Sequence, residues 1–353
     1  MQQHLEQLIQ DLRLTRRLPG FQYLAVTARS ALVELSQGYA GLAGVPMSRD
    51  TTMMAYSMSK TITAVAVLKL VENGSIRLED ALSRYVPWQP YGSDVRVREL
   101  LSHTAGIPNP IPLRWVHLAA DHEGFDEGAA LRAVLAKHGQ LAARPATRFV
   151  YSNIGYWLLG AVIEAVTGKS FVSYVTENVF TPLGLTATDM SYEITNLRRH
   201  ATGYLERFSI INLARPLLFD RRLIAGSIEH WVAVKPHYAD GPAFGGIVGT
   251  ARAFGTFLQD QLLDGSRIVG QEAQGYLMEQ QRTKRGLVPM TMGWHMGSLG
   301  RYRYFFKEGG GGGFHSMMRL YKSYGFGTVL MANATTVNVG RIMDRLDSQL
   351  FCN

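Results

Sequence analysis

Residues 57–74 read SMSKTITAVAVLKLVENG, and this stretch decides how the rest of the chain is interpreted. From Lys60 to Glu72 the segment is apolar except near its outer end, and Asn73-Gly74 follows as a helix C-terminal cap would. Ser57 stands three residues before Lys60, a spacing that no other lysine of the chain shares. The stretch therefore predicts a buried helix with a serine and a lysine on one face of its first turn.

Short strands are predicted on both sides of this helix, near the two ends of the chain. Alternating and β-branched residues predict strands over 21–27, 31–37, 301–306, 314–321 and 326–333, and a helix over 339–351. Further helices are predicted over 94–102, 127–138 and 152–167, and residues 148–150 resemble a strand. We expect an α/β (α+β) fold, in which an antiparallel sheet built from both termini is flanked by helices.

The predicted elements also suggest how the chain is divided. We expect a single unit over residues 1–353, with an α/β subdomain formed by 1–72 and 245–353. Residues 73–244 would form a mainly helical subdomain beside it. An active site would then lie in the cleft between the two parts.

Composition excludes several classes of function. The only cysteine, Cys352, rules out an intramolecular disulfide. The formal charge of +8 is spread along the chain without a basic stripe, so we expect no nucleic-acid partner, although anionic substrates fit this charge. No apolar run reaches the roughly 20 residues of a membrane span. Residues 1–17 predict a helix and lack the apolar region of a signal peptide, so we expect a cytoplasmic protein, or a periplasmic one if a leader was removed.

Ser57 and Lys60 form a candidate nucleophile and base. The N-terminus of the helix favours negative charge, and the free N–H of Ser57 can donate into an oxyanion hole. A serine needs a partner that removes its proton, and a lysine in a desolvated cleft can serve. The alternative is an ordinary serine and lysine on a helix surface.

Two further segments carry residues of the same chemistry. Tyr151-Ser152-Asn153 opens the helix over 152–167, where a phenolate could move a proton and the Asn153 amide could bind both Lys60 and a substrate carbonyl. Helix capping by Ser152 or Asn153 is the alternative. Lys307-Glu308-Gly309 ends a predicted strand, where a cation could bind an anionic substrate group and the N–H of Gly310 could donate to an oxyanion. A phosphate loop at 309–313 is disfavoured, because no Gly-Lys-Ser/Thr ending follows.

These three motifs in this order resemble those of the class C β-lactamases, the family VIII serine esterases and the D-alanyl-D-alanine peptidases of the penicillin-recognising family. Val97 to Pro108, Tyr151 to Gly168, Pro182 to Leu185 and Gly245 to Leu258 are also similar to segments of that family. The resemblance runs from about Phe21 to Asn333. It implies a β-lactamase/transpeptidase-like fold without a metal or organic cofactor.

The resemblance also implies roles. Ser57 would be acylated, Lys60 and Tyr151 would share the general-base role, Asn153 would position substrate, and Lys307 would complete the site. The N–H groups of Ser57 and Gly310 would hold the oxyanion, and Gly309 would let the substrate lie against the strand.

The third motif departs from the family pattern, because Glu308 stands where Thr or Ser is usual. An acid there would repel a substrate carboxylate, unless it points away and pairs with an arginine. His315 is close enough in sequence to line the pocket, although strand packing is the alternative. His103 is expected to hold a loop. His117, His122 and Glu123 lack the spacing of a helical zinc pair.

We therefore expect a serine hydrolase that works through an acyl-enzyme, with a carboxylesterase favoured. A β-lactamase, a D-Ala-type peptidase and a non-hydrolytic binding or scaffold protein on the same fold are the alternatives. The expected partner is a small ester or β-lactam, with no nucleic acid and no membrane. The sequence does not indicate the oligomeric state.

Overall fold

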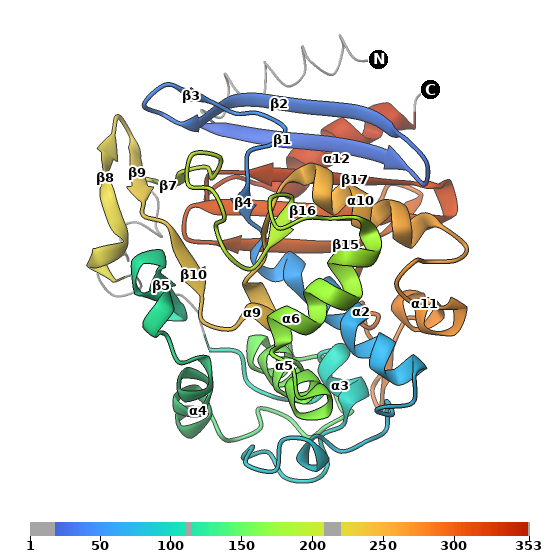
Figure 1. Cartoon of the computed structure of the whole chain (residues 1–353). Coiled ribbons are helices and arrows are strands. Elements are labelled where there is room, and N and C mark those ends of the chain that lie inside the picture. Colours follow the sequence, from blue (N-terminus) through green and yellow to red (C-terminus); the bar gives the residue numbers. More distant parts are fainter. Residues whose placement is uncertain (1–17, 111–113, 208–219, 352–353) are drawn as a thin grey trace.

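The computed structural model describes residues 18–110, 114–207 and 220–351 (Figure 1). The predicted helix over 1–17 and Cys352 lie outside these residues. The largest sheet is antiparallel and has the strand order β14-β15-β16-β17-β1-β2-β3. Its strands are β1 (Gly20–Thr27), β2 (Ala31–Gly41), β3 (Val45–Pro46), β14 (His295–Leu299), β15 (Tyr302–Gly311), β16 (Phe314–Tyr321) and β17 (Phe326–Ala332). Both ends of the chain build this sheet, and the expected fold class is confirmed.

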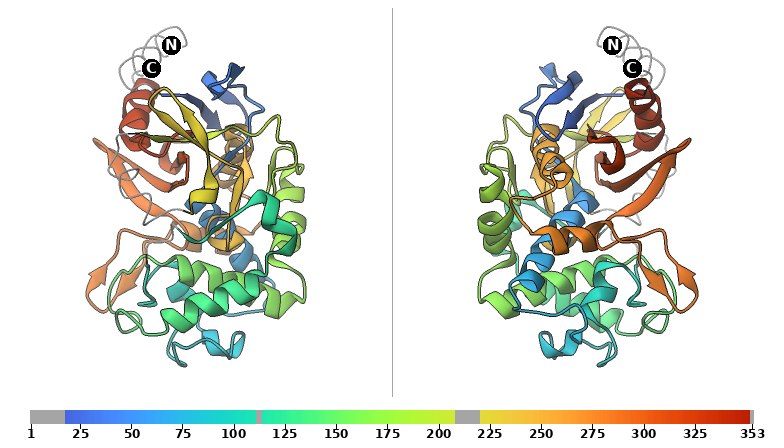
Figure 2. Two further views of the ribbon diagram at one scale, coloured as in Figure 1. Left: turned by 90° about the vertical axis from the view of Figure 1, so that its left-hand side faces the viewer. Right: turned by 90° about the vertical axis from the view of Figure 1, so that its right-hand side faces the viewer.

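Each face of the sheet is covered by a different helix (Figure 2). Successive side chains of a strand point to opposite faces. On β1, Leu24 and Val26 pack in the core that contains α10 (Ala251–Leu262), whereas Tyr23 and Ala25 pack in the core that contains α12 (Val339–Leu350). The α10 face continues into the helical part of the molecule.

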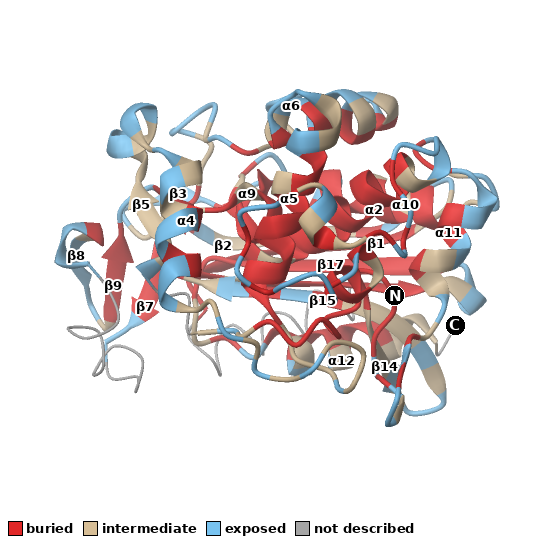
Figure 3. Cartoon of the chain, turned by 90° about the horizontal axis from the view of Figure 1, so that it is seen from below, coloured by how far each residue is buried: buried red, intermediate tan, exposed pale blue. Residues whose placement is uncertain are grey.

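The helical part lies beyond the α10 face. Its helices are α2 (Ser59–Glu72), α3 (Val97–Leu101), α4 (Glu127–Lys137), α5 (Asn153–Thr167), α6 (Phe171–Val175), α9 (Pro242–Gly245) and α11 (Gln271–Met278). Figure 3 shows α2 and most sheet strands as buried, whereas much of α4 and α11 is exposed. The predicted helix at the quoted stretch is therefore present as a central, buried element.

Four smaller sheets are present among the described residues. They pair β4 (Met53–Met54) and β6 (Met190–Ser191) with β11 (Val248–Gly249), β5 (Val116–Leu118) with β10 (His237–Ala239), β7 (Gly203–Glu206) and β8 (Ile224–Ile228) with β9 (Trp231–Val234), and β12 (Arg282–Thr283) with β13 (Gly286–Leu287). Residues 73–244 thus contain strands as well as helices. The division into two subdomains stays a prediction.

Three local predictions need correction. Residues 148–150 form no strand, because Val150 N donates to the His103 carbonyl in a loop instead of joining a ladder. Strand β15 does not end at residue 306 but continues through the glycines to Gly311, where β16 pairs with it. The helix predicted over 94–102 is the shorter α3. Strand β14 was not predicted from the sequence.

Among the described residues no single helix is long and apolar enough to cross a membrane. One pair, Asn153–Thr167 with Phe171–Leu183, meets the length and composition criteria together but is bent by 81°.

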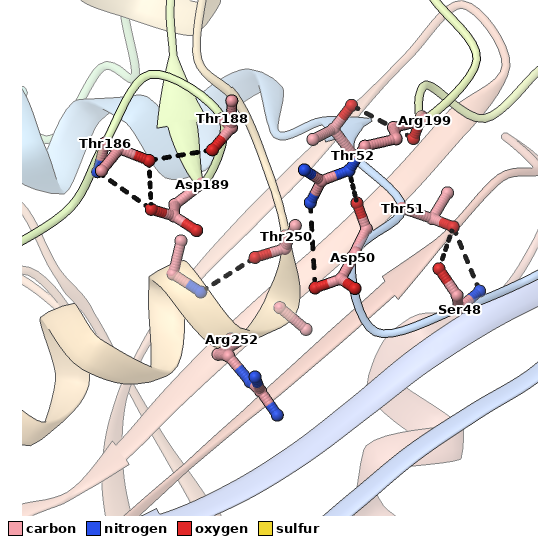
Figure 4. A network of polar contacts seen from close by, with 12 residues as sticks. Ser48, Asp50, Thr51, Thr52, Thr186, Thr188, Asp189, Arg199, Thr250 and Arg252 are labelled. Carbon is pink, nitrogen blue, oxygen red and sulfur yellow. Dashed lines mark hydrogen bonds and ion pairs between the residues drawn. The ribbon is translucent and has the colours of Figure 1, made fainter. Parts of the chain in front are cut away.

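A polar network holds the chain where it enters β4, just before Ser57 (Figure 4). Thr52 N donates to the Arg199 carbonyl over 2.8 Å, and Arg199 Nε donates to the Asp50 carbonyl over 3.1 Å. From β1, the Gln22 amide donates to the carbonyls of Ser48 and Thr51, each over 2.7 Å. The segment that leads to Ser57 is therefore tied to the large sheet.

Candidate active site

Ser57 lies in a short 3-10 turn, η1 (Tyr56–Met58), directly before α2. Backbone contacts fix this turn, since Ala55 N donates to the Ile247 carbonyl over 2.8 Å. Tyr56 has a φ of +44°, which is uncommon for a residue other than glycine and marks local strain. The turn lies against β15 and presents Ser57 Oγ, half-buried, to Tyr151 just before α5.

Two side chains reach Ser57 Oγ. Lys60 Nζ and the Tyr151 hydroxyl each lie 2.9 Å from it. Lys60 comes from the first turn of α2, and Tyr151 precedes α5, whose N-terminus Ser152 caps by accepting from Gly155 N. A serine oxygen within hydrogen-bond reach of two proton-handling groups is the arrangement that nucleophilic catalysis requires.

Lys60 is fully buried and fully hydrogen-bonded. Besides Ser57 Oγ, its Nζ donates to Asn153 Oδ1 and to the Phe244 carbonyl, each over 2.7 Å. Burial, and then the nearby Lys307, hold the pKa of Lys60 well below its usual value. A neutral amine would donate to the two fixed acceptors and accept the Ser57 proton, so this geometry suits a base.

The surroundings of Tyr151 favour a neutral phenol. Burial is the main cause that raises its pKa, and the charge of Glu308 adds to it. The ring lies between two imidazoles, with centroids 4.3 Å from His103 and 5.9 Å from His295. Burial, and then Lys307 and Lys60, lower the pKa of His295 to about 2, so this ring is neutral. The resting phenol is therefore a proton donor to Ser57 and not the phenolate considered above.

Lys307 lies within β15 and is fully buried. Its Nζ has no hydrogen-bond partner among the residues that the structure describes, and it lies 5.2 Å from the centroid of the Tyr151 ring. Burial lowers the pKa of Lys307 to about 7. An unpartnered buried amine beside Tyr151 is a candidate functional group of this site.

The glycines of β15 allow close contact between this strand and η1. A Cβ atom on Gly309 would overlap the Ala55 carbonyl oxygen and lie 2.8 Å from Ser57 N. Gly311 lies against the ring of Tyr56 in the same way. Gly310 lines a cavity that also contains Ser57. Strand β14 pairs only with residues 302–306, so the described strands leave this edge of residues 307–311 unpaired.

Glu308 and His315 are brought to each other and not to Ser57. His315 Nε2 donates to Glu308 Oε1 over 2.6 Å. Side chains alternate along β15, and Gly309 faces η1, so Glu308 and Gly310 face the opposite side of the strand. On that side a Cβ atom on Gly310 would meet the His315 ring. Glu308 therefore pairs with a histidine, not with an arginine. Neither residue is among the described residues that line the cavity.

The other histidines have structural contacts. His103 Nδ1 accepts from Ser152 N over 3.1 Å, which is the loop-holding bond expected of it. His117 Nε2 lies 2.9 Å from His122 Nδ1, and His117 Nδ1 lies 2.9 Å from Asp240. No cluster of three or more metal-ligating side chains was found in the described part of the chain.

The cavity beside Ser57 includes residues that the sequence did not point to. Its volume is about 60 Å³. Its wall is formed mainly by apolar or aromatic side chains from separate segments, namely Tyr56, Trp115, Val116, Leu223, Val234, Ala239 and Phe244, together with His237. No Arg, Lys, Asp or Glu is among the described lining residues. Only Tyr56 had a local signal, its position next to Ser57.

Known proteins resemble this chain in sequence and in fold. A family model described as beta-lactamase matches residues 5–350. Protein flp of Staphylococcus aureus (strain COL) is 27% identical over 244 residues, which are 65% of this chain and 48% of that protein. Penicillin-binding protein 4* of Bacillus subtilis (strain 168) is 29% identical over 187 residues, 52% of this chain and 41% of that protein. The chain thus spans about half the length of these relatives.

Two solved structures share the fold. D-amino acid amidase from Ochrobactrum anthropi SV3 has a TM-score of 0.83 at 21% identity and covers 99% of each chain. The octameric penicillin-binding protein homologue from Pyrococcus abyssi has a TM-score of 0.81 at 21% identity, over 99% of this chain and 77% of that one. With the family model matching nearly the whole sequence, the chain belongs to the beta-lactamase family.

Proposed function

We propose that this protein is a serine hydrolase that cleaves small carboxylic esters through an acyl-enzyme on Ser57. One observation carries the proposal: Ser57 Oγ lies 2.9 Å from both Lys60 Nζ and the Tyr151 hydroxyl. Membership of the beta-lactamase family supports the reaction class.

The residues fit a two-step reaction. Neutral Lys60 takes the Ser57 proton as Oγ attacks the ester carbonyl, and the N–H groups of Ser57 and Gly310 hold the oxyanion. Collapse breaks the bond to the alcohol, whose oxygen takes a proton from Tyr151, and the Lys60 ammonium restores the phenol. A water molecule then attacks the acyl carbon, passes its proton to the same groups and releases the acid and free Ser57.

The cavity supports an ester with a short, apolar acyl group. Its lining is mainly apolar and, among the described residues, carries no permanently charged side chain. The accessible part of this cavity is small, about 60 Å³, which favours a short acyl group over a long one. Acetyl esters should therefore be better substrates than butyryl esters.

β-Lactam hydrolysis is the second candidate, favoured by Lys307. Its buried, unpartnered Nζ beside Tyr151 could bind the carboxylate of a β-lactam. Because Glu308 is held by His315 on the other side of β15, repulsion by Glu308 is a weaker reason to exclude this substrate than the sequence suggested.

The test measures turnover of p-nitrophenyl acetate, p-nitrophenyl butyrate and nitrocefin by the wild type and by Ser57→Ala. The alanine variant should lose at least about 10³-fold in kcat on the esters, and the wild type should form an acyl adduct on Ser57 detectable by mass spectrometry. Ser75→Ala, an exposed serine beyond the far end of α2, is the control. Full ester turnover by Ser57→Ala would exclude Ser57 as the nucleophile, and faster turnover of nitrocefin than of either ester would favour the second candidate.

A further inference from the structure

We propose that Tyr56 and His237 are positioning residues that hold the glycine strand beside Ser57 through a chain of hydrogen bonds. The Tyr56 hydroxyl donates to the Gly312 carbonyl over 3.0 Å and lies 2.8 Å from His237 Nε2. His237 Nδ1 lies 2.8 Å from the Lys235 carbonyl. The inference rests on the proposed function, because the held strand is the one expected to bind the oxyanion.

The chain of bonds connects the two segments that would form the oxyanion hole. Tyr56 directly precedes Ser57, and Gly312 comes two residues after Gly310. On its other side the glycine segment is held by Thr335, whose hydroxyl donates to the Gly311 carbonyl over 2.5 Å. The Tyr56 hydroxyl therefore helps to set the separation between the N–H groups of Ser57 and Gly310. A small change of that separation weakens an oxyanion contact steeply.

The protonation state of His237 decides which of these hydrogen bonds can form at the same time. The chain runs from the Gly312 carbonyl through the Tyr56 hydroxyl and the His237 ring to the Lys235 carbonyl, so it contains three contacts. Both carbonyls can only accept, and each contact needs one proton to be a hydrogen bond, so three protons are required. A phenol and a neutral imidazole supply two, whereas a phenol and an imidazolium supply three. In the neutral Nδ1–H tautomer, Nε2 accepts the Tyr56 proton and the Gly312 carbonyl is released. In the Nε2–H tautomer, the Gly312 contact is kept but the Lys235 contact is lost.

Protonation of His237 therefore completes the chain and holds Gly312. His237 and Tyr56 are both buried. The titratable or charged groups around His237 are Tyr56 from η1, His117 from β5, His200 from the segment before β7, and Lys235 in its own segment. Burial lowers the pKa of His237, so the third proton is gained only on the acid side of the usual histidine range.

Tyr56→Phe tests the positioning role, because the ring against Gly311 remains and only the hydroxyl is lost. With p-nitrophenyl acetate, kcat should fall about tenfold while KM changes less than twofold. Affinity for phenylboronic acid, which adds to Ser57 and mimics the tetrahedral intermediate, should fall by the same factor. Tyr91→Phe is the matched control, since it removes another buried phenol bond to a carbonyl, that of His138, in the helical part.

His237→Gln tests the proton count. Its amide N–H can replace Nε2–H as donor to Tyr56 but cannot titrate, so the pH dependence of kcat, and not its value at one pH, is the readout. The ratio of wild-type to His237→Gln kcat should rise as the pH falls through the pKa of His237, and taking this ratio removes the pH dependence that Lys60 gives both proteins. A ratio independent of pH between 4.5 and 8 would overturn the role of His237.

The outcomes separate this inference from the proposed function. If Ser57→Ala is inactive but Tyr56→Phe keeps wild-type kcat and boronate affinity, or if Tyr91→Phe loses as much kcat as Tyr56→Phe, the positioning role is wrong and the hydrolase remains. If the wild type neither hydrolyses esters nor binds the boronate, the proposed function itself fails.

Discussion

At the scale of single residues, the site depends on how two buried lysines share one small region. The Lys60 amine is hydrogen-bonded to Ser57, Asn153 and Phe244, whereas the Lys307 amine has no hydrogen-bond partner among the described residues. Two cations in one desolvated site disfavour each other's charge, and burial acts in the same direction. Both amines are therefore shifted toward their neutral forms, and Lys60 is the one in contact with Ser57 Oγ.

Removing the Lys60 amine should abolish most of the activity. We expect Lys60→Met to lower kcat/KM for p-nitrophenyl acetate by about 10²–10⁴-fold, because general-base assistance is lost. The base works only when neutral, so wild-type activity should fall as the pH drops through the pKa of Lys60. Since that pKa is lowered, the acid limb of the pH–rate profile should lie well below the usual pKa range of a lysine. Lys69→Met, on the same helix but bonded to the Ile268 carbonyl, should keep the wild-type profile.

At the scale of secondary-structure elements, the site depends on how closely β15 approaches the turn η1. The alternation along β15 turns Gly309 and Gly311 toward η1 and Gly310 toward His315. Only residues without a Cβ atom permit this approach on the η1 side. Packing between a strand and a turn therefore explains Gly309 and Gly311 without a phosphate ligand.

Gly309→Ala should disable the enzyme more than Gly310→Ala. The added methyl group on Gly309 meets backbone atoms of Ala55 and Ser57, which cannot move without displacing the nucleophile. We expect kcat to fall at least about 10²-fold, as a displacement near 1 Å produces. On Gly310 the methyl group would lie 3.3 Å from the His315 ring, a side chain that can shift, and the N–H is kept. Equal kcat values for the two variants would contradict this account.

At the scale of the whole molecule, one buried carboxylate joins the two ends of the chain. Asp347 of α12 accepts hydrogen bonds from Tyr23 of β1, from Arg319 and Tyr321 of β16, and from Thr328 of β17, over 2.8–3.2 Å. This network lies on the α12 face of the sheet, away from the η1 turn. The charge is compensated chiefly by Arg319, which is buried as well.

Asp347→Ala should destabilise the fold without changing the chemistry. Removing one partner of a buried ion pair leaves the other uncompensated and costs about 3–5 kcal/mol of the free energy of unfolding. Urea unfolding measures this loss, and kcat per active site, titrated with the boronate, should stay within twofold. Asp344→Ala is the matched control, because Asp344 also pairs with Arg319 but is half-exposed, and its loss should cost less than about 1 kcal/mol. A cost for Asp347→Ala as small as that of the control would show that the buried network is not needed.

The sequence predicted those features that depend on residues close to one another in the chain. Helix α2 and its end at Asn73, the Ser152 cap of α5, and the strands near both termini follow from local periodicity and capping. The family was also evident, because its motifs are short and ordered. The roles assigned to Lys60, Tyr151, Asn153 and Lys307 stay predictions, although the structure brings these residues together around Ser57.

Only the tertiary structure decided the features that depend on distant segments. Strands β5 and β10 are short, and they exist because each satisfies the backbone groups of a partner far along the chain. His237 lies 180 residues after Ser57 yet is bonded to Tyr56 beside it, and no local pattern could show this. The bond between Glu308 and His315 is shorter in range, seven residues within one hairpin, and it follows from the register of β15 and β16. Side-chain type and spacing therefore pointed to Ser57 as the candidate nucleophile, whereas the tertiary structure determined what surrounds it.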